Sequence, residues 1–394
     1  MVEVLPFKGI RYSLKELENL VTEPYDKISK EMQRDYYKKN PYNFIRLNLP
    51  DAQDPYNSSR DTLKKWLDSG ILVKDEKPYF YQYIETFNLF GREYTRHGFF
   101  AIVKLEDYSE KKILPHERTF KGPKEDRLKM LRATNTDLEP VFFLYDDPEN
   151  FVQNTFENKK RELEIDVIVN GIRNRIYKIK NDEISKFFEN KQLVIADGHH
   201  RYETALAYAK EKGFEKGTGY IMAVLVNRQD PGLVILPSHR VIKQTMPPEK
   251  LLENLKKYFT VNEISINEIR GFLNQDIVFC YRDHAYSLNI KKEFLQNKSI
   301  SQNLNVSYLN SYVINEILNI KNREEINFER WPQDVLKQIE NENKYAFLVK
   351  PVNPTTVWNV AMNGEIMPEK STDFYPKLMS GFKLFDLNDA INKI

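Results

Sequence analysis

The chain has 394 residues, 41% of them hydrophobic and 29% charged, so it is long enough for two or three globular domains and unlike a disordered protein. Its 59 Lys and Arg residues nearly balance 57 Asp and Glu residues, and this net charge of +2 argues against nucleic acid as the main partner. The only cysteine, Cys280, excludes a disulfide framework and a cysteine zinc cluster. There is no signal-peptide pattern and no apolar run of about 18 residues, so we expect a cytoplasmic protein that does not enter membranes.

The first predicted elements are short. Ser13, with Glu16 three residues later, forms a capping-box pattern that predicts a short helix after a first strand. Prolines alternate with apolar residues in "PYDKIS" (24–29) and "NPYNFIRLNLP" (40–50), which predicts loops and short strands there. A helix is predicted over residues 58–70, with Gly70 as its C-terminal stop.

Hairpins and helices alternate in the middle of the chain. Aromatic and β-branched residues over 79–105 predict one hairpin, and Asn170-Gly171 between two apolar runs predicts another. Periodicity and apolar runs predict further elements in this order: a helix over 122–135, a strand over 139–147, a helix over 182–190 and a buried strand over 220–226.

The composition changes after about residue 245. Residues 247–343 are richer in Lys, Asn and Glu, and they combine helical patterns with a strand pair around 276–290. We therefore predict a catalytic, phosphate-binding domain at 1–245 and a C-terminal domain at 246–394, with residues 345–382 returning to the active site. The alternation of strands and helices predicts an α/β (α+β) fold class.

The stretch "LVIADGHHRYETALAY" (193–208) holds the strongest functional signal. A strand end, a turn at Asp197-Gly198 and a helix that follows would expose the helix N-terminus, which suits phosphate. Gly198 lets an anion approach the backbone, and Arg201 adds a bidentate fork. We expect Asp197 to hold Mg²⁺, and His199 and His200 to contact phosphate or exchange protons. The alternative is structural: the histidines cap the helix and Asp197 forms an Asx-turn.

Two further clusters carry titratable and anion-binding groups. In "LPHERTFKGPKEDRL" (114–128), Glu117 is a candidate general base for the acceptor hydroxyl. In "MPEKSTDFYPKL" (367–378), three successive donors suit phosphate oxygens: Lys370, Ser371 and Thr372. The remaining candidates, assigned to substrate binding, are Arg11, Asp26, His116, Arg118, Thr119 and Arg127.

Several segments, in their order, resemble the domain-of-unknown-function 1015 family over about residues 6–382. They are "PFKGIR", "PYD", "NPYNFIRL", "LEDY", "HERT", "ADGHHRYETAL", "LPSHR" and "MPEKSTDFYPKL". Members of that family are similar to pyrophosphate-dependent kinases of free L-serine, which make O-phospho-L-serine. The resemblance implies phosphate or Mg²⁺ contacts at Asp197, Gly198, His199, His200 and Arg201.

The spacing of Gly198, Arg201 and Ala205 also resembles the phosphate-binding box of the ParB and sulfiredoxin superfamily. This implies a ParB/sulfiredoxin-like catalytic core with an additional mixed α/β C-terminal domain. Sulfiredoxin activity is excluded because His199 stands where that chemistry needs a cysteine. A strand pattern follows the box where the ParB proteins have a helix-turn-helix, so DNA binding loses its main support.

Three functions are therefore weighed. The first is a serine kinase that uses pyrophosphate, ATP or ADP with Mg²⁺. The second is a metal-dependent hydrolase of a phosphorylated small molecule, with a transition metal held by His116, Asp197, His200 and Glu203. The third is a nucleotide-responsive, ParB-like nucleic-acid binder. The donor, the identity of the base, a phosphohistidine intermediate, the oligomeric state and the role of residues 246–343 stay open.

Overall fold

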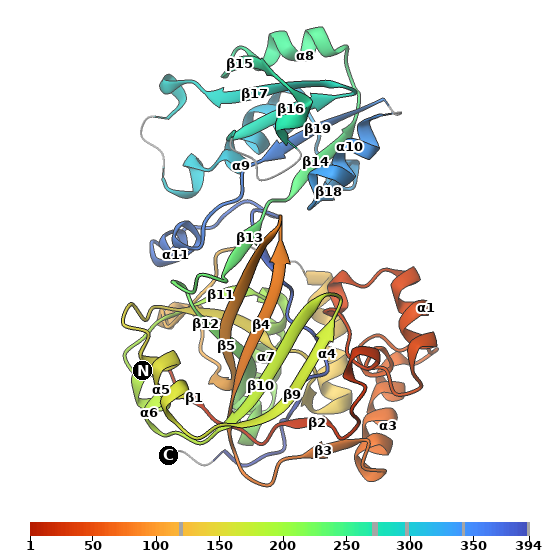
Figure 1. Ribbon diagram of the computed structural model, residues 1–394, viewed down its shortest axis with the longest axis vertical. Helices are drawn as coiled ribbons and strands as arrows, with labels where there is room; N and C mark the ends of the chain where they lie inside the picture. Colours follow the sequence, from red (N-terminus) through yellow and green to blue (C-terminus); the bar gives the residue numbers. More distant parts are fainter. Residues whose placement is uncertain (118–120, 270–274, 296–298, 341–342, 392–394) are drawn as a thin grey trace. The chain divides into compact units, whose positions relative to one another are not determined.

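The computed structural model describes residues 1–117, 121–269, 275–295, 299–340 and 343–391. The chain forms two compact units (Figure 1). Unit 1 consists of Met1–Pro115, Thr119–Leu233 and Pro376–Ile394, and unit 2 consists of His116–Arg118 and Val234–Tyr375. The chain therefore leaves unit 1 after Leu233 and returns to it at Pro376. A catalytic domain at 1–245 stays a prediction, because compactness does not test catalysis.

Unit 1 is built on a nine-stranded mixed sheet with the order β6-β11-β8-β12-β5-β4-β10-β9, and β1 pairs with β5 off this path. β12 lies parallel to β8 and antiparallel to β5. The strands are β1 (Val4–Leu5), β4 (Phe80–Leu89), β5 (Arg92–Lys104), β6 (Ile113–Leu114), β8 (Val141–Tyr145), β9 (Glu162–Val169), β10 (Ile172–Ile179), β11 (Leu193–Asp197) and β12 (Tyr220–Asn227). Two small pairs complete the unit: β2 (Ile10–Tyr12) with β3 (Leu72–Lys74), and β7 (Thr136–Asp137) with β21 (Phe385–Asp386).

Both predicted hairpins of unit 1 are confirmed. β9 and β10 are antiparallel and joined by Asn170 and Gly171, whose φ values are +52° and +79°. A two-residue turn with positive φ at both positions matches the twist of antiparallel strands, which is why Asn-Gly favours it. Phe90 and Gly91 make the equivalent turn between β4 and β5, also with positive φ at both positions.

The helices of unit 1 follow from apolar periodicity and local caps. α7 contributes Tyr202, Ala205 and Ala209 to a core that includes Phe143 of β8 and Ile221 of β12. Because these helix positions recur every three or four residues, one face of α7 is buried. The helices are α1 (Lys30–Lys39), α2 (Ile45–Asn48), α3 (Pro55–Asp68), α4 (Lys121–Thr134), α5 (Phe151–Asn158), α6 (Glu183–Phe188) and α7 (His199–Glu211).

The capping-box prediction for Ser13 is wrong. Residues Leu17–Asn19 form only one 3-10 turn, η1, and Ser13 does not cap it. The Ser13 hydroxyl donates to the carbonyl oxygen of Gly70 at 2.6 Å, and its backbone N–H donates to that of Ile71 at 3.0 Å. Hydrogen bonds to a distant segment therefore replace the local cap that the sequence pattern suggested.

Unit 1 contains a buried network of ion pairs that includes Arg11. The Arg11 Nε atom lies 2.5 Å from Glu164 Oε1, and Lys178 Nζ lies 2.8 Å from the same oxygen and 2.6 Å from Asp75 Oδ1. Lys383, near the end of the chain, also pairs with Glu164 and is 1% exposed. Burial lowers the pKa of the Lys383 ammonium to about 8, although Glu164 and Asp75 oppose this shift. The network joins segments from the beginning, middle and end of the sequence.

Unit 2 is built on a six-stranded antiparallel sheet with the order β15-β17-β16-β19-β14-β18. Its strands are β14 (His239–Lys243), β15 (Phe259–Ile264), β16 (Ile277–Tyr281), β17 (His284–Ile290), β18 (Ile326–Glu329) and β19 (Lys344–Val349), and β13 (Val234–Leu236) pairs separately with β20 (Asp373–Tyr375). Its helices include α8 (Pro248–Leu255), α9 (Asn305–Tyr308), the π-helix η8 (Leu309–Ile317), α10 (Pro332–Glu340) and α11 (Pro354–Met362). Val335 and Ile339 of α10 pack on one face of this sheet, against Val241, Val278 and Cys280.

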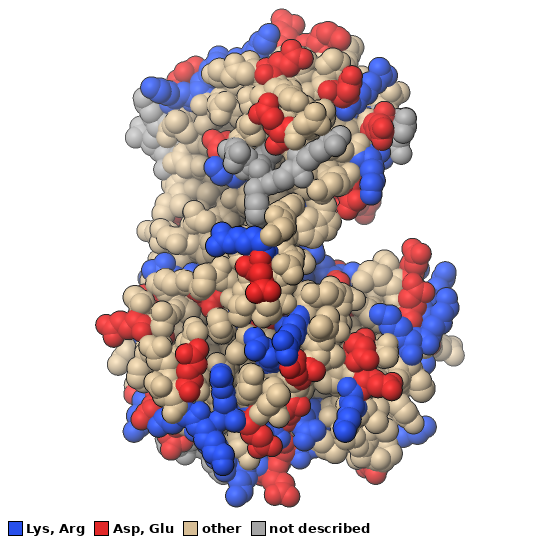
Figure 2. Space-filling view, viewed as in Figure 1, with Lys and Arg blue, Asp and Glu red and all other residues tan. Residues whose placement is uncertain are grey.

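The architecture confirms the predicted α/β (α+β) fold class, because both units combine sheets with helices. Cys280 is fully buried on β16, as a structural cysteine would be. Among the described residues, no helix is both long and apolar enough to cross a membrane. On the face that Figure 2 shows, basic and acidic side chains are interspersed on each unit, as the small net charge suggests.

Candidate functional site

The polar turn between β11 and α7 is a tight strand-to-helix junction. β11 ends at Asp197, Gly198 is the N-cap with φ of +92°, and α7 begins at His199. Such a φ favours glycine, and a Cβ atom here would lie 3.0 Å from Arg201 Nε. The positive end of the α7 dipole lies at this junction, and helix N-termini of this kind commonly bind anions.

Asp197 is held by positive charge. Its Oδ1 accepts from the Gly198 N–H at 2.9 Å, and its Oδ2 accepts from Lys377 Nζ at 3.2 Å. Burial raises the pKa of the Asp197 carboxyl, but the charges of Lys377, Arg201 and Lys27 outweigh burial and hold this pKa well below its usual range. Asp197 is therefore ionised at neutral pH. Sequence reasoning missed Lys377, although it lies within the "MPEKSTDFYPKL" segment.

Arg201 projects from the first turn of α7 and is largely buried. Its Nη1 donates to the carbonyl oxygen of Pro140, and its Nη2 lies 3.9 Å from Asp197 Oδ2. Burial lowers the pKa of the Arg201 guanidinium, but the charges of Glu139, Asp197 and Asp26 raise it above its ordinary value. Arg201 is thus a permanent cation. Asp26 lies on η2 (Tyr25–Lys27), and its effect on this pKa places it near Arg201.

Glu139, a residue that the sequence did not single out, organises the surroundings of Arg201. Its Oε1 accepts from the Tyr25 N–H at 2.9 Å, from Asn48 Nδ2 at 2.6 Å and from Ser380 Oγ at 2.7 Å. Arg127 joins the same group, because its Nη1 donates to the Asn48 carbonyl at 3.1 Å and its guanidinium lies 4.3 Å from the centre of the Tyr25 ring. One buried carboxylate therefore ties together several segments of unit 1.

A small cavity of about 40 Å³ lies among these side chains. It exceeds the roughly 10–15 Å³ that a single water needs on this measure. Asp137 is one of its polar lining residues, and its Oδ2 accepts from the Met222 N–H at 2.9 Å. Burial raises the pKa of the Asp137 carboxyl to about 7, although that hydrogen bond and the charge of Arg201 lower it. The lining residues are Asn48, Arg127, Met130, Leu131, Thr136, Asp137, Leu138, Glu139, Arg201, Thr204 and Ile221.

Asp137→Asn is expected to change how stability depends on pH. Because the pKa of Asp137 is higher in the folded chain than in the unfolded chain, the folded state binds the proton more tightly. This contribution is complete below about pH 4, and it is lost at about 1.4 kcal/mol per pH unit as the pH rises towards 7. Thermal unfolding at pH 5, 6, 7 and 8 should show the variant gaining stability relative to the parent as the pH rises. Parallel pH profiles for the two proteins would contradict this assignment.

The two histidines of the turn lie at the start of α7. His199 is buried with 7% of its surface exposed, and His200 is partly exposed. The carbonyl oxygen of His200 accepts from Thr204 Oγ1 at 2.6 Å, an ordinary helical contact. The contacts of unit 1 therefore gather the 197–201 turn, Asp26 and Arg127 in one region, whereas Arg11 belongs to the ion-pair network with Glu164.

The other predicted residues belong to unit 2, where a threonine links two of them. Thr372 Oγ1 donates to Glu117 Oε1 at 3.0 Å and lies 3.0 Å from His116 Nε2. His116 is fully buried, and 24% of the Glu117 side chain is exposed. The role of Glu117 as the base stays a prediction. Arg118 and Thr119 lie outside the described residues.

The segment before Thr372 has a distinctive backbone. Lys370 has a φ of +54°, in the left-handed region that a non-glycine residue seldom adopts. The Ser371 hydroxyl donates to the carbonyl oxygen of Pro368 at 2.5 Å. Phosphate contacts by Lys370, Ser371 and Thr372 stay predictions.

The metal site of the hydrolase hypothesis needs at least three ligands close together. Glu203, one of its four candidates, pairs with Lys124. Over the described ranges, no group of three His, Cys, Asp or Glu side chains is placed to hold a metal ion. Mg²⁺ differs from transition metals here, because it often binds through one or two carboxylates together with substrate phosphates and water. Asp197 fits that requirement.

Comparison with known proteins gives a family and distant structural neighbours. A family model described as a protein of unknown function, DUF1015, matches residues 4–309. No curated protein matches the chain. The solved structures that it matches include a free serine kinase variant in complex with AMP (12% identity, covering 74% of this chain and 90% of that chain, TM-score 0.40). They also include a conserved hypothetical protein from Pyrococcus furiosus (14%, 72% and 94%, 0.37) and C-terminally truncated SbnI from Staphylococcus aureus (12%, 73% and 87%, 0.39).

Proposed function

Because the chain belongs to the DUF1015 family, we propose that it acts as its sequence motifs suggest, as a phosphotransferase that phosphorylates free L-serine to O-phospho-L-serine. Pyrophosphate is the proposed donor, with Mg²⁺. The observation that supports this most is the junction at Asp197–Arg201, where backbone donors, Arg201 and Lys377 gather around one turn. The motif resemblance supports serine and pyrophosphate, and the geometry of this junction supports the phosphate site.

The junction has the features that phosphoryl transfer requires. The transferred group carries charge on its oxygens, so catalysis depends mainly on positioning and on compensating positive charge. Gly198 has no Cβ atom, so the Arg201 guanidinium can lie close to the start of α7, and its planar fork matches two phosphate oxygens. Lys377 adds a second cation at Asp197 Oδ2, the same oxygen that lies 3.9 Å from Arg201 Nη2. Glu139 keeps the Arg201 guanidinium charged and its surroundings ordered.

Asp197 is the residue of this junction best suited to hold Mg²⁺. It is ionised at neutral pH, and a Mg²⁺ ion arriving with the donor phosphates would be held by its carboxylate. The ion would supply charge neutralisation between the phosphates. Lys377 holds the same carboxylate in place, so it positions this ligand as well as compensating charge.

The reaction is tested by phosphorus NMR with Mg²⁺ and L-serine, with pyrophosphate, ATP and ADP in separate samples. We expect O-phosphoserine and an equal amount of inorganic phosphate from pyrophosphate. L-Alanine, which has no hydroxyl group, is the matched control acceptor and should give no product. Phosphate release that is equally fast with either amino acid would indicate a hydrolase instead. A folded protein that gives no O-phosphoserine with any donor would overturn the proposal.

A further inference from the structure

Arg240 is a cation buried in an apolar part of unit 2. It lies on β14, where its register partners are Phe347 on β19 and Phe328 on β18. Only 2% of its surface is exposed, and its guanidinium lies 5.4 Å from the centre of the Phe328 ring. Burying a charge in such surroundings costs several kcal/mol unless an opposite charge compensates it.

The protein does not supply that opposite charge. Arg240 Nη1 donates to the carbonyl oxygen of Ser238, Nη2 donates to that of Lys370 at 3.4 Å, and Nε has no hydrogen-bond partner. Within the described ranges no carboxylate pairs with this guanidinium, and burial lowers its pKa to about 10. The equally buried Arg96 of unit 1 differs, because Glu85 pairs with it at 2.5 Å.

The guanidinium of Arg240 keeps donors that an anion could use. A guanidinium has five N–H donors, and the two carbonyl contacts use two of them. The second contact, from Nη2 to the Lys370 carbonyl at 3.4 Å, places the segment around Lys370 beside the guanidinium. A phosphate group matches the guanidinium fork, because two of its oxygens can accept from two N–H groups at once.

We propose that Arg240 is the central ligand of an anion site in unit 2, which binds a phosphate group next to residues 370–372. That this phosphate group belongs to the phosphoryl donor rests on the proposed phosphotransferase function. The site itself depends on the charge of Arg240 and not on the reaction. It would explain why a buried arginine is kept without an acidic partner.

The test is phosphate binding to the full chain by isothermal titration calorimetry, with inorganic phosphate and pyrophosphate as separate probes. The proposed site in unit 1 is weakened with Arg201→Ala, and this protein is compared with Arg201→Ala/Arg240→Met. We expect Arg240→Met to weaken binding by at least about tenfold, as the loss of a charge-assisted fork would. Equal affinity in the two proteins, or no binding to Arg201→Ala, would overturn the anion site. The result does not depend on whether the chain transfers phosphate.

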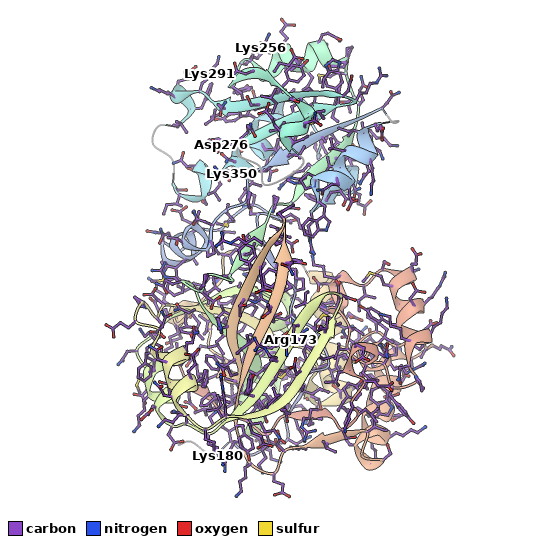
Figure 3. The ribbon with its side chains drawn as sticks, viewed as in Figure 1. Arg173, Lys180, Lys256, Asp276, Lys291 and Lys350 are labelled. Carbon is purple, nitrogen blue, oxygen red and sulfur yellow. The ribbon has the colours of Figure 1, made fainter. Side chains whose placement is uncertain are left out.

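Thermal unfolding without phosphate distinguishes an arginine that binds an anion from an arginine that stabilises the fold. Arg240→Met removes an uncompensated buried charge, so its midpoint should equal or exceed that of the parent. The matched control is Arg173→Met on β10 (Figure 3). It removes an exposed arginine that pairs with Asp166 at 2.7 Å. It should leave phosphate affinity unchanged. Arg240→Lys keeps the charge but loses the fork, and if Arg240→Met does not fold, unchanged affinity in Arg240→Lys would overturn the proposal.

Discussion

Replacing Arg201 with alanine is expected to lower the rate of phosphoserine formation about a hundredfold to a thousandfold, because one preorganised charge contact to the transferred group contributes roughly 2.7–4 kcal/mol. Arg201 is the cation placed at the start of α7, and Glu139 and Asp197 hold it charged. Arg201→Lys keeps the charge but loses the bidentate fork, so we expect an intermediate loss. Initial rates measured by phosphorus NMR, with circular dichroism to verify folding, provide the measurement.

Arg132→Ala is the matched control for this experiment. Arg132 lies on α4 and pairs with Glu211 of α7 at 2.6 Å, with 50% and 40% of the two side chains exposed. Exposed pairs contribute at most about 1 kcal/mol, so neither activity nor folding should change measurably. If Arg201→Ala were as active as Arg132→Ala, the phosphate site could not lie at the 197–201 turn.

Replacing Arg96 with methionine is expected to destabilise unit 1 by about 3–5 kcal/mol, because it leaves the buried Glu85 without its cation. The two side chains are 0% and 2% exposed, and Arg96 also donates to the carbonyl oxygen of Pro376 at 2.8 Å. Burial raises the pKa of the Glu85 carboxyl, and Arg96 opposes that shift. Without Arg96 the pKa should rise further, so the variant should lose more stability as the pH increases. Differential scanning calorimetry at pH 5 and pH 8 measures both effects.

The double variant Glu85→Leu/Arg96→Met separates the effect of the uncompensated Glu85 charge from the effect of losing the contact between Arg96 and Pro376. It replaces the pair with apolar side chains, so most of the lost stability should return. Activity should stay low if the Pro376 contact is needed to hold Lys377 beside Asp197. A double variant as unstable as Arg96→Met would show that the uncompensated charge was not the cause.

The sequence predicted the elements whose causes are local. Asn170-Gly171 defines its hairpin through its own backbone preference, and α7 follows from the apolar period of Ala205, Leu206 and Ala209. The family resemblance is confirmed by the model that matches residues 4–309. The Ser13 cap failed because the hydroxyl is used by a segment more than fifty residues away, which a local pattern does not reveal.

The candidate site was predictable where its residues are consecutive. Asp197 to Arg201 form one turn, so chain continuity alone brings them together. Lys377 and Glu139 reach this turn only through the tertiary fold, and nothing in their local sequence distinguishes them from other charged residues. Arg240 lies in the "LPSHR" segment, but its significance depends on having no paired carboxylate among the described residues, and a local pattern does not reveal this.

The discontinuity of unit 1 has a consequence for biosynthesis. Lys377, Ser380 and Lys383 contact Asp197, Glu139 and Glu164, but they are translated after residues 234–375, which form most of unit 2. At about 5–20 residues per second, the ribosome needs on the order of ten seconds to make the intervening segment. Until that segment has been made, the carboxylates of Asp197, Glu139 and Glu164 lack these three contacts. The part of unit 1 that precedes residue 234 is therefore more exposed to proteases and chaperones in that interval, and the residues that follow Tyr375 then complete its fold.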